Sequence, residues 1–304
     1  MTETVLLTRQ CPACGSSDNH PEVKCTRQAE AMPFDELRAF WSGLFKERVF
    51  FTYHRCSSCG LLFNTHFFTS DQLNTLYSEM APNMDHVTTD AILATQRGYF
   101  DEAIAEAPKG GDYLEIGPDV GYITAHAADD GRFGHLWLVE PNLAVGEQLA
   151  AATKGAPHTI STNMEDLSIV PDGSVGLAVM IHVLDHLLDP VAMLEQIRRK
   201  LRPDGVLAVV THNEKSMLRY VMRLNWPPFC LQHPQVYNPQ SMSVLMKRSG
   251  FERVEVRRSK NYFPLDFMVK QAAWSAKVDI SKMNLPKTRI GLRLGNIMTL
   301  SRRA

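Results

Sequence analysis

The sequence predicts an α/β protein in which a doubly wound sheet follows a small cysteine-rich module. Two Cys-x-x-Cys pairs lie within the first 59 residues, and from residue 112 onward short apolar segments alternate with helical ones. The apolar segments lack the two-residue alternation of a strand with one wet face. Strands that are covered by helices on both faces have this continuous apolar pattern, which is typical of parallel sheets.

The composition limits the class of protein. At about 150 residues per domain, the 304 residues correspond to two domains or to one large domain with an appendage. The formal net charge of −1 excludes a globally basic protein, so a nucleic acid is not an expected partner. No apolar run approaches the ~18 residues of a membrane span, and the N-terminus lacks the residue order of a signal peptide. We therefore expect a cytoplasmic protein without a transmembrane segment.

The first 66 residues form the predicted cysteine module. Each Cys-x-x-Cys pair is followed by a glycine that eases the backbone turn, so that four thiolates can surround one Zn²⁺ tetrahedrally. The predicted ligands are Cys11, Cys14, Cys56 and Cys59. Such a site has no open position, so its expected role is structural. Coincidental thiols and a redox pair are the alternatives, and Cys25 is either a replacement ligand or a small buried residue.

The elements that follow are predicted from apolar periodicity and helix caps. Residues 67–108 form a helical linker with a first helix capped by Thr69 or Ser70 and a second at about 90–107. In the α/β domain, 109–304, the predicted strands are 112–116, 135–140, 159–161, 176–181, 206–211, 253–258 and 292–301. The predicted helices are 122–128, 144–153, one with Asp189 as cap and Pro190 in its first position, and one from Asn238. The irregular segment of about 216–237 is predicted to be a lid insertion.

Two features of the α/β domain favour a nucleotide-like ligand. The first predicted strand leads into Gly117 and Gly121, and glycines at a strand-to-helix turn let a ligand approach the backbone closely. The second predicted strand ends at Glu140, and an acid about 20 residues after the turn is placed to accept hydrogen bonds from ribose hydroxyls.

On these residues the chain resembles the class I S-adenosylmethionine-dependent methyltransferases. The matching motifs are Glu115-x-Gly117-x-x-x-Gly121, Glu140, the pair Glu165-Asp166 and the stretch His182–Gly205. The resemblance implies a Rossmann-like sheet of seven strands in the order 3-2-1-4-5-7-6. A zinc-binding module ahead of this core resembles, more narrowly, the sugar C-methyltransferases and related small-molecule methyltransferases.

The resemblance also implies S-adenosylmethionine as cofactor, together with structural Zn²⁺. It places Glu115 and Gly117 at the methionine end, Glu140 at the ribose and Glu165 or Asp166 near the adenine. The full implied set of cofactor-binding residues is Tyr77, Glu115, Gly117, Asp119, Gly121, Glu140, Glu165, Asp166 and His182. Asp119 departs from the general family by adding a carboxylate to the turn, although Asp tolerates the positive φ that the turn needs.

Methyl transfer requires alignment of donor and acceptor and removal of the acceptor's proton, for which histidine is suited near neutral pH. The candidate catalytic residues are His233, His186, Tyr237 and His182. His182 and His186 follow the fourth strand, whereas His233 and Tyr237 resemble the segment that supplies a base and an aromatic partner in sugar methyltransferases. For each histidine, packing or loop anchoring is the competing interpretation.

The predicted function is therefore methyl transfer to a small-molecule acceptor, for which a nucleotide- or lipid-linked sugar or a secondary metabolite is expected. An RNA methyltransferase with a zinc module is the alternative enzyme, but the N-terminal residues lack a Lys/Arg stripe interleaved with aromatics. A methyltransferase-like scaffold without activity is the alternative from another class. We further expect the zinc module to pack over the cleft and shape the acceptor pocket, rather than to lie at the periphery and mediate dimerisation.

Overall fold

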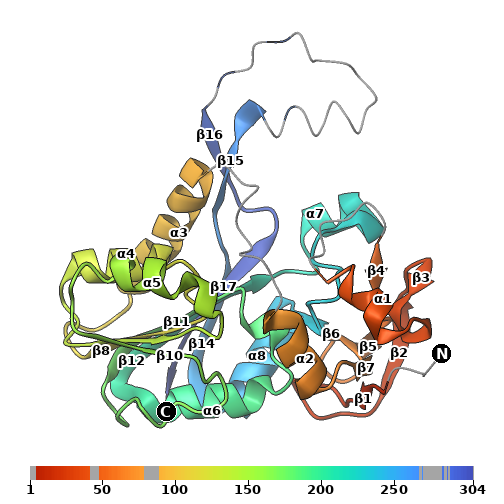
Figure 1. Cartoon of the computed structure of the whole chain (residues 1–304), viewed down its shortest axis with the longest axis horizontal. Coiled ribbons are helices and arrows are strands. Elements are labelled where there is room, and N and C mark those ends of the chain that lie inside the picture. The colour runs from red at the N-terminus through yellow and green to blue at the C-terminus, as the bar shows by residue number, and fades with distance from the viewer. Residues whose placement is uncertain are drawn as a thin grey trace.

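The computed structural model describes residues 5–41, 48–78, 89–266 and 288–303, together with positions 269, 283 and 286. Its centre is a mixed sheet of seven strands (Figure 1). The strands are β8 (Asp112–Ile116), β9 (Leu136–Val139), β10 (His158–Ser161), β11 (Val175–Ile181), β12 (Leu201–His212), β14 (Phe251–Arg258) and β17 (Asn296–Arg303). The α/β fold predicted from the sequence is thus confirmed.

The order of the strands across the sheet is β10-β9-β8-β11-β12-β17-β14. Among these seven strands in chain order, this is third, second, first, fourth, fifth, seventh, sixth. β17 runs antiparallel to both of its neighbours, β12 and β14, whereas the other pairs are parallel. The parallel strands therefore all end at one edge of the sheet, where ligands bind in open α/β folds.

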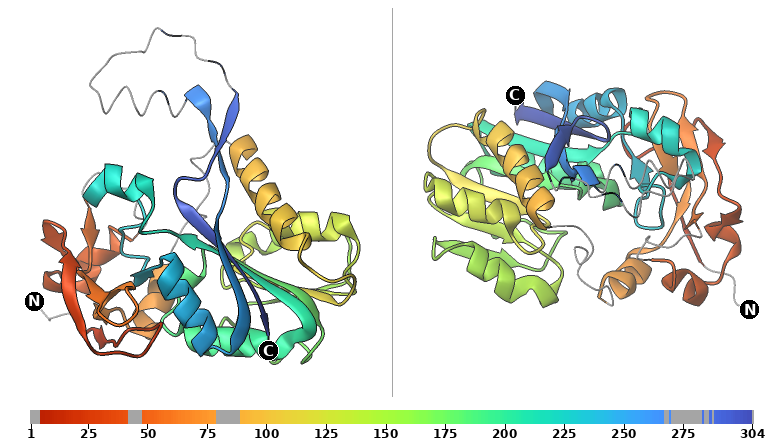
Figure 2. Two further views of the ribbon diagram at one scale, coloured as in Figure 1. Left: turned by 180° about the vertical axis from the view of Figure 1, so that it is seen from behind. Right: turned by 90° about the horizontal axis from the view of Figure 1, so that it is seen from above.

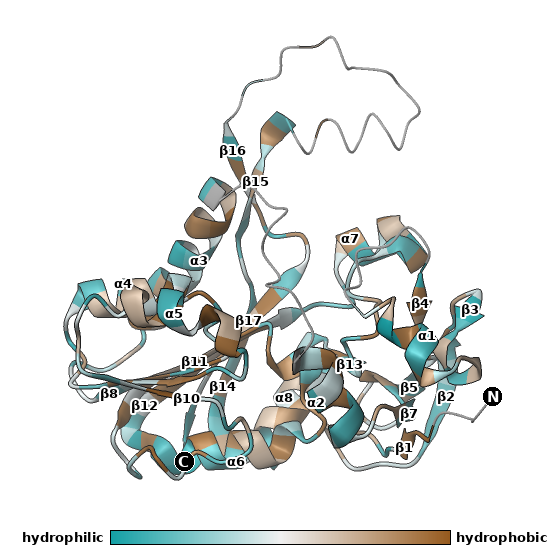
Figure 3. Cartoon of the chain, viewed as in Figure 1, coloured by the Kyte–Doolittle hydropathy of each residue, from teal (hydrophilic) through white to brown (hydrophobic). Residues whose placement is uncertain are grey.

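Helices cover both faces of the sheet (Figures 1 and 2). α3 (Thr89–Ile104), α4 (Tyr122–Asp130) and α5 (Gly146–Ala152), which follows η2 (Leu143–Val145), lie on one face, and α6 (Pro190–Lys200) and α8 (Pro239–Arg248) lie on the other. Alternate residues of β11 belong to different cores. Leu177 and Val179 pack on the face of α3, α4 and α5, and Ala178 and Met180 pack on the face of α6 and α8. This double burial explains the continuous apolar pattern, and Figure 3 shows hydrophobic residues along the central strands.

The helix starts follow the predicted caps. The Asp189 side chain accepts a hydrogen bond from the Ala192 amide at the start of α6. Asn238 forms a capping box with Ser241 at the start of α8. At the start of α2 (Ser70–Ser78), the Thr69 amide donates to Gln72 and the Gln72 amide donates to the Thr69 hydroxyl. Each side chain satisfies an amide that has no partner within its helix.

The N-terminal module has its own four-stranded sheet, which includes a strand from far along the chain. Its order is β13 (Gln235–Val236), β6 (Leu62–Asn64), β5 (Tyr53–Cys56) and β2 (Asn19–Val23). β13 closes the segment predicted to be a lid, which also holds α7 (Met217–Met222) and η4 (Arg223–Asn225). Trp226 and Phe229 of this segment are buried against Phe50 and Tyr53. The segment and the module therefore share one apolar core.

The shorter elements of the module were not predicted. They are β1 (Leu7–Thr8) paired with β7 (His66–Phe67), β3 (Arg27–Gln28) paired with β4 (Val49–Phe50), η1 (Ala29–Ala31) and α1 (Phe34–Arg38). The last strand, predicted at 292–301, begins later in the structure, and a separate strand precedes it. β16 (Arg289–Leu292) pairs with β15 (Asn261–Pro264) beside α3, and β17 begins only at Asn296 (Figure 2). Within the described ranges, no helix combines the length and the hydropathy that crossing a membrane would need.

Candidate functional site

The turn between β8 and α4 has the left-handed backbone that its glycines predict. Gly117, Asp119 and Gly121 have φ values of 69°, 52° and 83°. A Cβ atom added to Gly117 would lie 2.5 Å from Cγ2 of Val183, which belongs to the loop after β11. The turn thus lies directly against the residue that follows His182.

Replacing Gly117 by Ala should strain this turn and displace it from Val183. The new methyl group meets Val183 at a distance that real Cβ atoms do not tolerate, and the positive φ disfavours any L side chain. We expect the melting temperature to fall by a few degrees, as for a loss of about 1–2 kcal/mol, and cofactor affinity to fall at least tenfold. Scanning calorimetry measures the melting temperature and titration calorimetry the affinity. The matched control is Gly155→Ala, at an open turn of similar φ.

Glu140 connects the turn to the end of β9. Its side chain is 8% exposed, and its two oxygens accept hydrogen bonds of 2.8 Å from the amides of Asp119 and Asn142. The Glu140 amide donates to the carbonyl of Ser161 at the end of β10. The carboxylate therefore lies at the sheet edge predicted from the sequence, beside the glycine turn.

Two further carboxyl groups surround this position. Glu115 is 3% exposed and accepts hydrogen bonds from the hydroxyls of Tyr113 and Thr124, at 2.9 and 2.6 Å. Burial raises the pKa of Glu115 to about 7, and burial also raises the pKa values of Asp119 and Glu140. A positively charged ligand at this edge would stabilise all three ionised carboxylates.

The raised pKa of Glu115 predicts a pH-dependent stability. The ionised form is disfavoured in the folded protein, so stability is greatest while Glu115 is protonated and decreases as the pH rises from about 4.5 towards 7. Glu115→Gln keeps an acceptor for Tyr113 and Thr124 but cannot ionise. Between pH 5 and pH 8 we expect the free energy of unfolding to fall by about 2 kcal/mol more in the wild type than in this variant. Equal pH dependence in denaturant titrations of both proteins would contradict the assignment.

Glu165 and Asp166 lie in the loop after β10, along the same edge. The Asp166 carboxylate accepts hydrogen bonds from the amide and the hydroxyl of Ser168, so it stabilises its own turn. Gln196 of α6 donates to the Glu165 carbonyl and holds the loop in place. The Glu165 side chain is exposed, and its role at an adenine stays a prediction.

Four histidine rings meet beyond the ends of β11 and β12. The His182 and His212 ring centroids are 4.4 Å apart, those of His212 and His233 are 5.0 Å apart, and those of His233 and His186 are 4.6 Å apart. We call these four residues the histidine cluster. Three of them were predicted as candidates, but His212 was not. A search for polar residues at the ends of adjacent strands would have found it, because His212 ends β12 next to His182.

Each ring of the histidine cluster is held by a different partner. His186 Nδ1 and the Tyr77 hydroxyl are 3.1 Å apart, and His212 Nδ1 is 2.9 Å from Asp185 Oδ2. His233 Nδ1 donates to the carbonyl of Pro228, which fixes the tautomer of that imidazole. Tyr77 of α2 therefore contacts the histidine cluster, and its predicted place over the cofactor stays a prediction.

The charges of the cluster follow from burial. Burial lowers the pKa values of His182 and His186 well below the usual range, and it lowers that of His212 despite the nearby Asp185. These rings are neutral at pH 7 and can accept protons. For His233, burial lowers the pKa, but attraction to a Cys230 thiolate, whose sulfur is 3.4 Å from Nδ1, outweighs burial and raises the pKa to about 9.

Tyr237 packs in the apolar core. It is fully buried in an apolar cluster with Phe63 of the module and Met242 of α8. Trp226 and Phe229 also pack in a core, as described above. The structure thus brings His182, His186 and His233 together and places Tyr237 in the core, so a catalytic role for Tyr237 stays a prediction.

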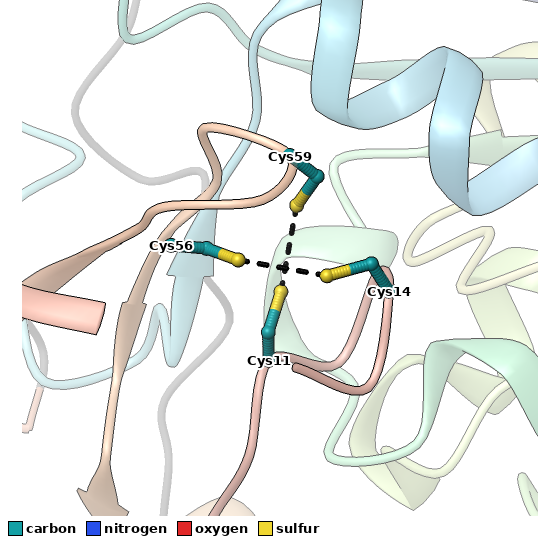
Figure 4. Close-up of side chains that lie close together, drawn as sticks. All are labelled: Cys11, Cys14, Cys56 and Cys59. Carbon is teal, nitrogen blue, oxygen red and sulfur yellow. Dashed lines mark hydrogen bonds between the residues drawn. The ribbon is translucent and has the colours of Figure 1, made fainter. Parts of the chain in front are cut away.

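The four predicted cysteine ligands converge (Figure 4). Their Sγ atoms all lie within 4.8 Å of one another, and Cys11–Cys59 and Cys14–Cys56 are each 3.5 Å apart. The amides of Gly15 and Gly60 donate to the carbonyls of Cys11 and Cys56, which closes the two knuckles. Four sulfurs at about 2.3 Å from a zinc ion lie about 3.8 Å apart, so these residues fit the ion.

The remaining cysteine of the module is not part of this group. The Cys25 thiol contacts the carbonyl of Phe50 at 3.3 Å and lies in the core shared with Trp226.

Among the cysteines of the cluster, burial raises the pKa of Cys14 to about 11. The buried thiols therefore need a cation to be held as thiolates at neutral pH.

The cysteine module is joined to the sheet edge by a partly buried ion pair. Arg55, next to Cys56, contacts the Glu214 carboxylate at 2.7 Å, and Glu214 follows β12 by two residues. Asn238, the cap of α8, donates to both Glu214 and the Gly60 carbonyl. The cysteines also share an apolar cluster with α8. A structural change in the module would thus reach the strand end that carries His212.

Comparison with known families gives one match. A family model described as a methyltransferase domain matches residues 93–256, which is more than half of the chain. None of the curated proteins compared with the chain matches it.

Solved structures resemble the chain over about 70% of its length. A chain from the complex that contains the Trm112 methyltransferase activator of Haloferax volcanii is 16% identical, with a TM-score of 0.50 over 70% of this chain and 93% of that one. An S-adenosylmethionine-dependent methyltransferase from Thermotoga maritima is 17% identical, with a TM-score of 0.48 over 70% and 91%. Phosphoethanolamine N-methyltransferase 2 from Haemonchus contortus, solved with S-adenosylhomocysteine, is 15% identical, with a TM-score of 0.44 over 71% and 57%. At these identities the likeness concerns the fold.

Proposed function

The chain belongs to the methyltransferase domain family, and from this we propose that it transfers a methyl group from S-adenosylmethionine to a small-molecule acceptor. The observation that carries the proposal is the group of three carboxyls around the glycine turn. Glu115, Asp119 and Glu140 all have raised pKa values because burial disfavours their charge. A sulfonium cofactor supplies the positive charge that this arrangement lacks.

The residues of the turn fit that cofactor. Gly117 lets Val183 pack directly against the turn, and Glu140 at the end of β9 keeps lone pairs for ligand hydroxyls beside its two bonds from backbone amides. When bound, S-adenosylmethionine supplies an electrophilic methyl group, and its S–CH₃ bond breaks to leave S-adenosylhomocysteine. The chain's own residues must align the acceptor and remove its proton.

The histidine cluster supports a role in that proton removal. Val183 contacts Gly117 and directly follows His182, so the cluster adjoins the cofactor turn. His182 and His186 are neutral at pH 7, because burial lowers their pKa values, whereas His233, whose pKa is raised to about 9, is protonated at that pH. The electron pair of the acceptor forms the new bond to the methyl group, and its proton passes to one of these imidazoles.

A small acceptor suits the site better than RNA. Tyr77 and Trp226 adjoin the cluster, and His233 is 7% exposed. A sugar or a secondary metabolite is the proposed class, in line with the resemblance to sugar C-methyltransferases. We further propose that the four cysteines hold structural Zn²⁺, which stabilises the end of β12 through Arg55 and Glu214.

The test is acceptor-dependent formation of S-adenosylhomocysteine. The zinc-loaded protein is incubated with S-adenosylmethionine and a panel of nucleotide-linked sugars, free sugars and phenolic or amine metabolites, with a structured RNA as a separate arm. We expect turnover with a small molecule and none with RNA. Turnover only with RNA would favour the alternative enzyme, and no cofactor binding by folded protein would favour the scaffold without activity.

A further inference from the structure

The histidine cluster contains a set of atoms with the composition of a metal site. His182, Asp185 and His212 each offer one ligand atom, and these atoms all lie within 4.8 Å of one another. Two imidazoles and one carboxylate are a donor set that binds first-row divalent ions and leaves coordination positions open. This group is separate from the four cysteines and was not predicted as a metal site from the sequence.

Two buried polar atoms of the group point to a missing ligand. Within the described residues, His182 Nδ1 and Asp185 Oδ1 are buried and have no hydrogen-bond partner. Asp185 is fully buried, and a buried polar atom without a partner is costly enough to be rare in native proteins. Nε2 of His182 lies 3.2 Å from the Asn296 side-chain amide, so a cation at Nδ1 requires that amide to present its oxygen to an Nε2–H. Such a cation would satisfy the carboxylate oxygen and the imidazole nitrogen together.

The Asp185 carboxylate faces two imidazoles: it pairs with His212, and it helps to raise the pKa of His233. In the part of the chain that the structure describes, its ion-pair partner is His212, whose Nδ1 is 2.9 Å from Oδ2. This distance is close to the ~3.0 Å between adjacent ligand atoms of an octahedral ion with ligand bonds of about 2.1 Å, and it is shorter than the ~3.4 Å of a tetrahedral ion. The second contact of the carboxylate is the His212 amide at 3.2 Å. The pair therefore has the geometry of two ligands on one ion.

The backbone conformation of His182 also holds its ring beside Asp185 and His212. His182 has φ of 54°, which is uncommon for a residue other than glycine and is concentrated at functional sites. Its amide donates to the Val210 carbonyl, which fixes the residue over the end of β12. The structure thus maintains a strained residue that directs a ring towards Asp185 and His212.

We propose that His182, Asp185 and His212 bind one first-row divalent cation whose open positions take an oxygen of the acceptor. The inference rests on the proposed function for its role, because the group adjoins the cofactor turn through Val183. A cation at this position would restrict the class of acceptor to molecules that present a hydroxyl, enol or carboxylate oxygen as a metal ligand.

The test is a count of metal ions in the full-length protein. After removal of loosely bound metal, the zinc-loaded protein is dialysed in turn against micromolar Mn²⁺, Co²⁺ and Zn²⁺, and metal per chain is measured by mass spectrometry. We expect one equivalent beyond the zinc of the cysteine cluster for at least one of these ions. Asp185→Asn, which keeps an acceptor for the His212 amide, and His182→Gln should each weaken that binding at least tenfold. His158→Gln, at an exposed histidine, should not.

Two results would overturn the proposal: no additional equivalent of any of the three ions, or an additional equivalent that survives both substitutions in folded protein. The first would leave Asp185 and His212 as a proton-sharing pair. S-adenosylmethionine binding is titrated in parallel, in the absence of added metal. Cation binding without cofactor binding would uphold this inference and contradict the proposed function. Cofactor binding without cation binding would support the proposed function and contradict this inference.

Discussion

Glu140→Ala should weaken the binding of both S-adenosylmethionine and S-adenosylhomocysteine by about 100-fold. The carboxylate is the group at the end of β9 that can accept hydrogen bonds from the ribose, and each such bond to a charged acceptor contributes about 1.5–3 kcal/mol. Losing two of them corresponds to about 3 kcal/mol, or two orders of magnitude in Kd. The substitution also frees the amides of Asp119 and Asn142, which loosens the turn itself. Calorimetric titration with each ligand measures the effect.

Two further variants separate the role of Glu140 from general damage. Glu140→Gln retains an acceptor oxygen without the charge and should fall between the wild type and Glu140→Ala. Glu147→Ala removes an exposed carboxylate from the first turn of α5 and should bind as the wild type does. Unchanged affinity in Glu140→Ala, with a folded protein, would remove Glu140 from the cofactor site.

Replacing both Cys56 and Cys59 by Ser should abolish zinc binding and destabilise the whole chain. Structural zinc contributes apparent binding free energies of about 10–16 kcal/mol, which is comparable to the total stability of a domain. The cysteine cluster packs in the same apolar core as α8, and Arg55 links it to Glu214 at the end of β12. We expect the melting temperature to fall by at least about 10 °C, because a chain of this size loses about 2–4 °C per kcal/mol.

The measurement combines zinc content with thermal unfolding by circular dichroism. Cys25→Ser is the matched control, because Cys25 lies outside the cluster and a serine hydroxyl can donate to the Phe50 carbonyl in its place. It should keep one zinc ion per chain and nearly the wild-type melting temperature. If the double variant retained zinc and stability, the four cysteines would not be a structural metal site.

The sequence was sufficient to predict the parts of the fold that depend on local signals. Continuous apolar runs indicated strands buried on both faces, and Asp189 and Asn238 marked the starts of α6 and α8 because their side chains satisfy free amides there. The strand at Arg289–Leu292 was not predicted, and the last strand was predicted to begin at Leu292 instead of Asn296, because the short turn between them gives little local signal. The two-residue strands of the module were not predicted either, because so short a segment gives little local signal.

The long-range arrangement could not be predicted in the same way. Nothing local in Gln235–Val236 indicates that it adds a strand to the module's sheet, because that pairing brings together residues far apart in sequence. The meeting of His212 with Asp185 likewise depends on the register of β11 against β12. Glu140 and Gly117 were found from the sequence because their spacing is set by a single strand–helix–strand unit.

The central claim is that this chain binds S-adenosylmethionine at the turn between β8 and α4. The most direct measurement is calorimetric titration of the purified, zinc-loaded protein with S-adenosylmethionine and with S-adenosylhomocysteine. The arrangement of Glu115, Gly117 and Glu140 predicts one site per chain with micromolar affinity for both ligands. The claim would be contradicted if neither ligand gave binding heat at millimolar concentration, and neither competed with the other, in protein shown to be folded and to hold its zinc.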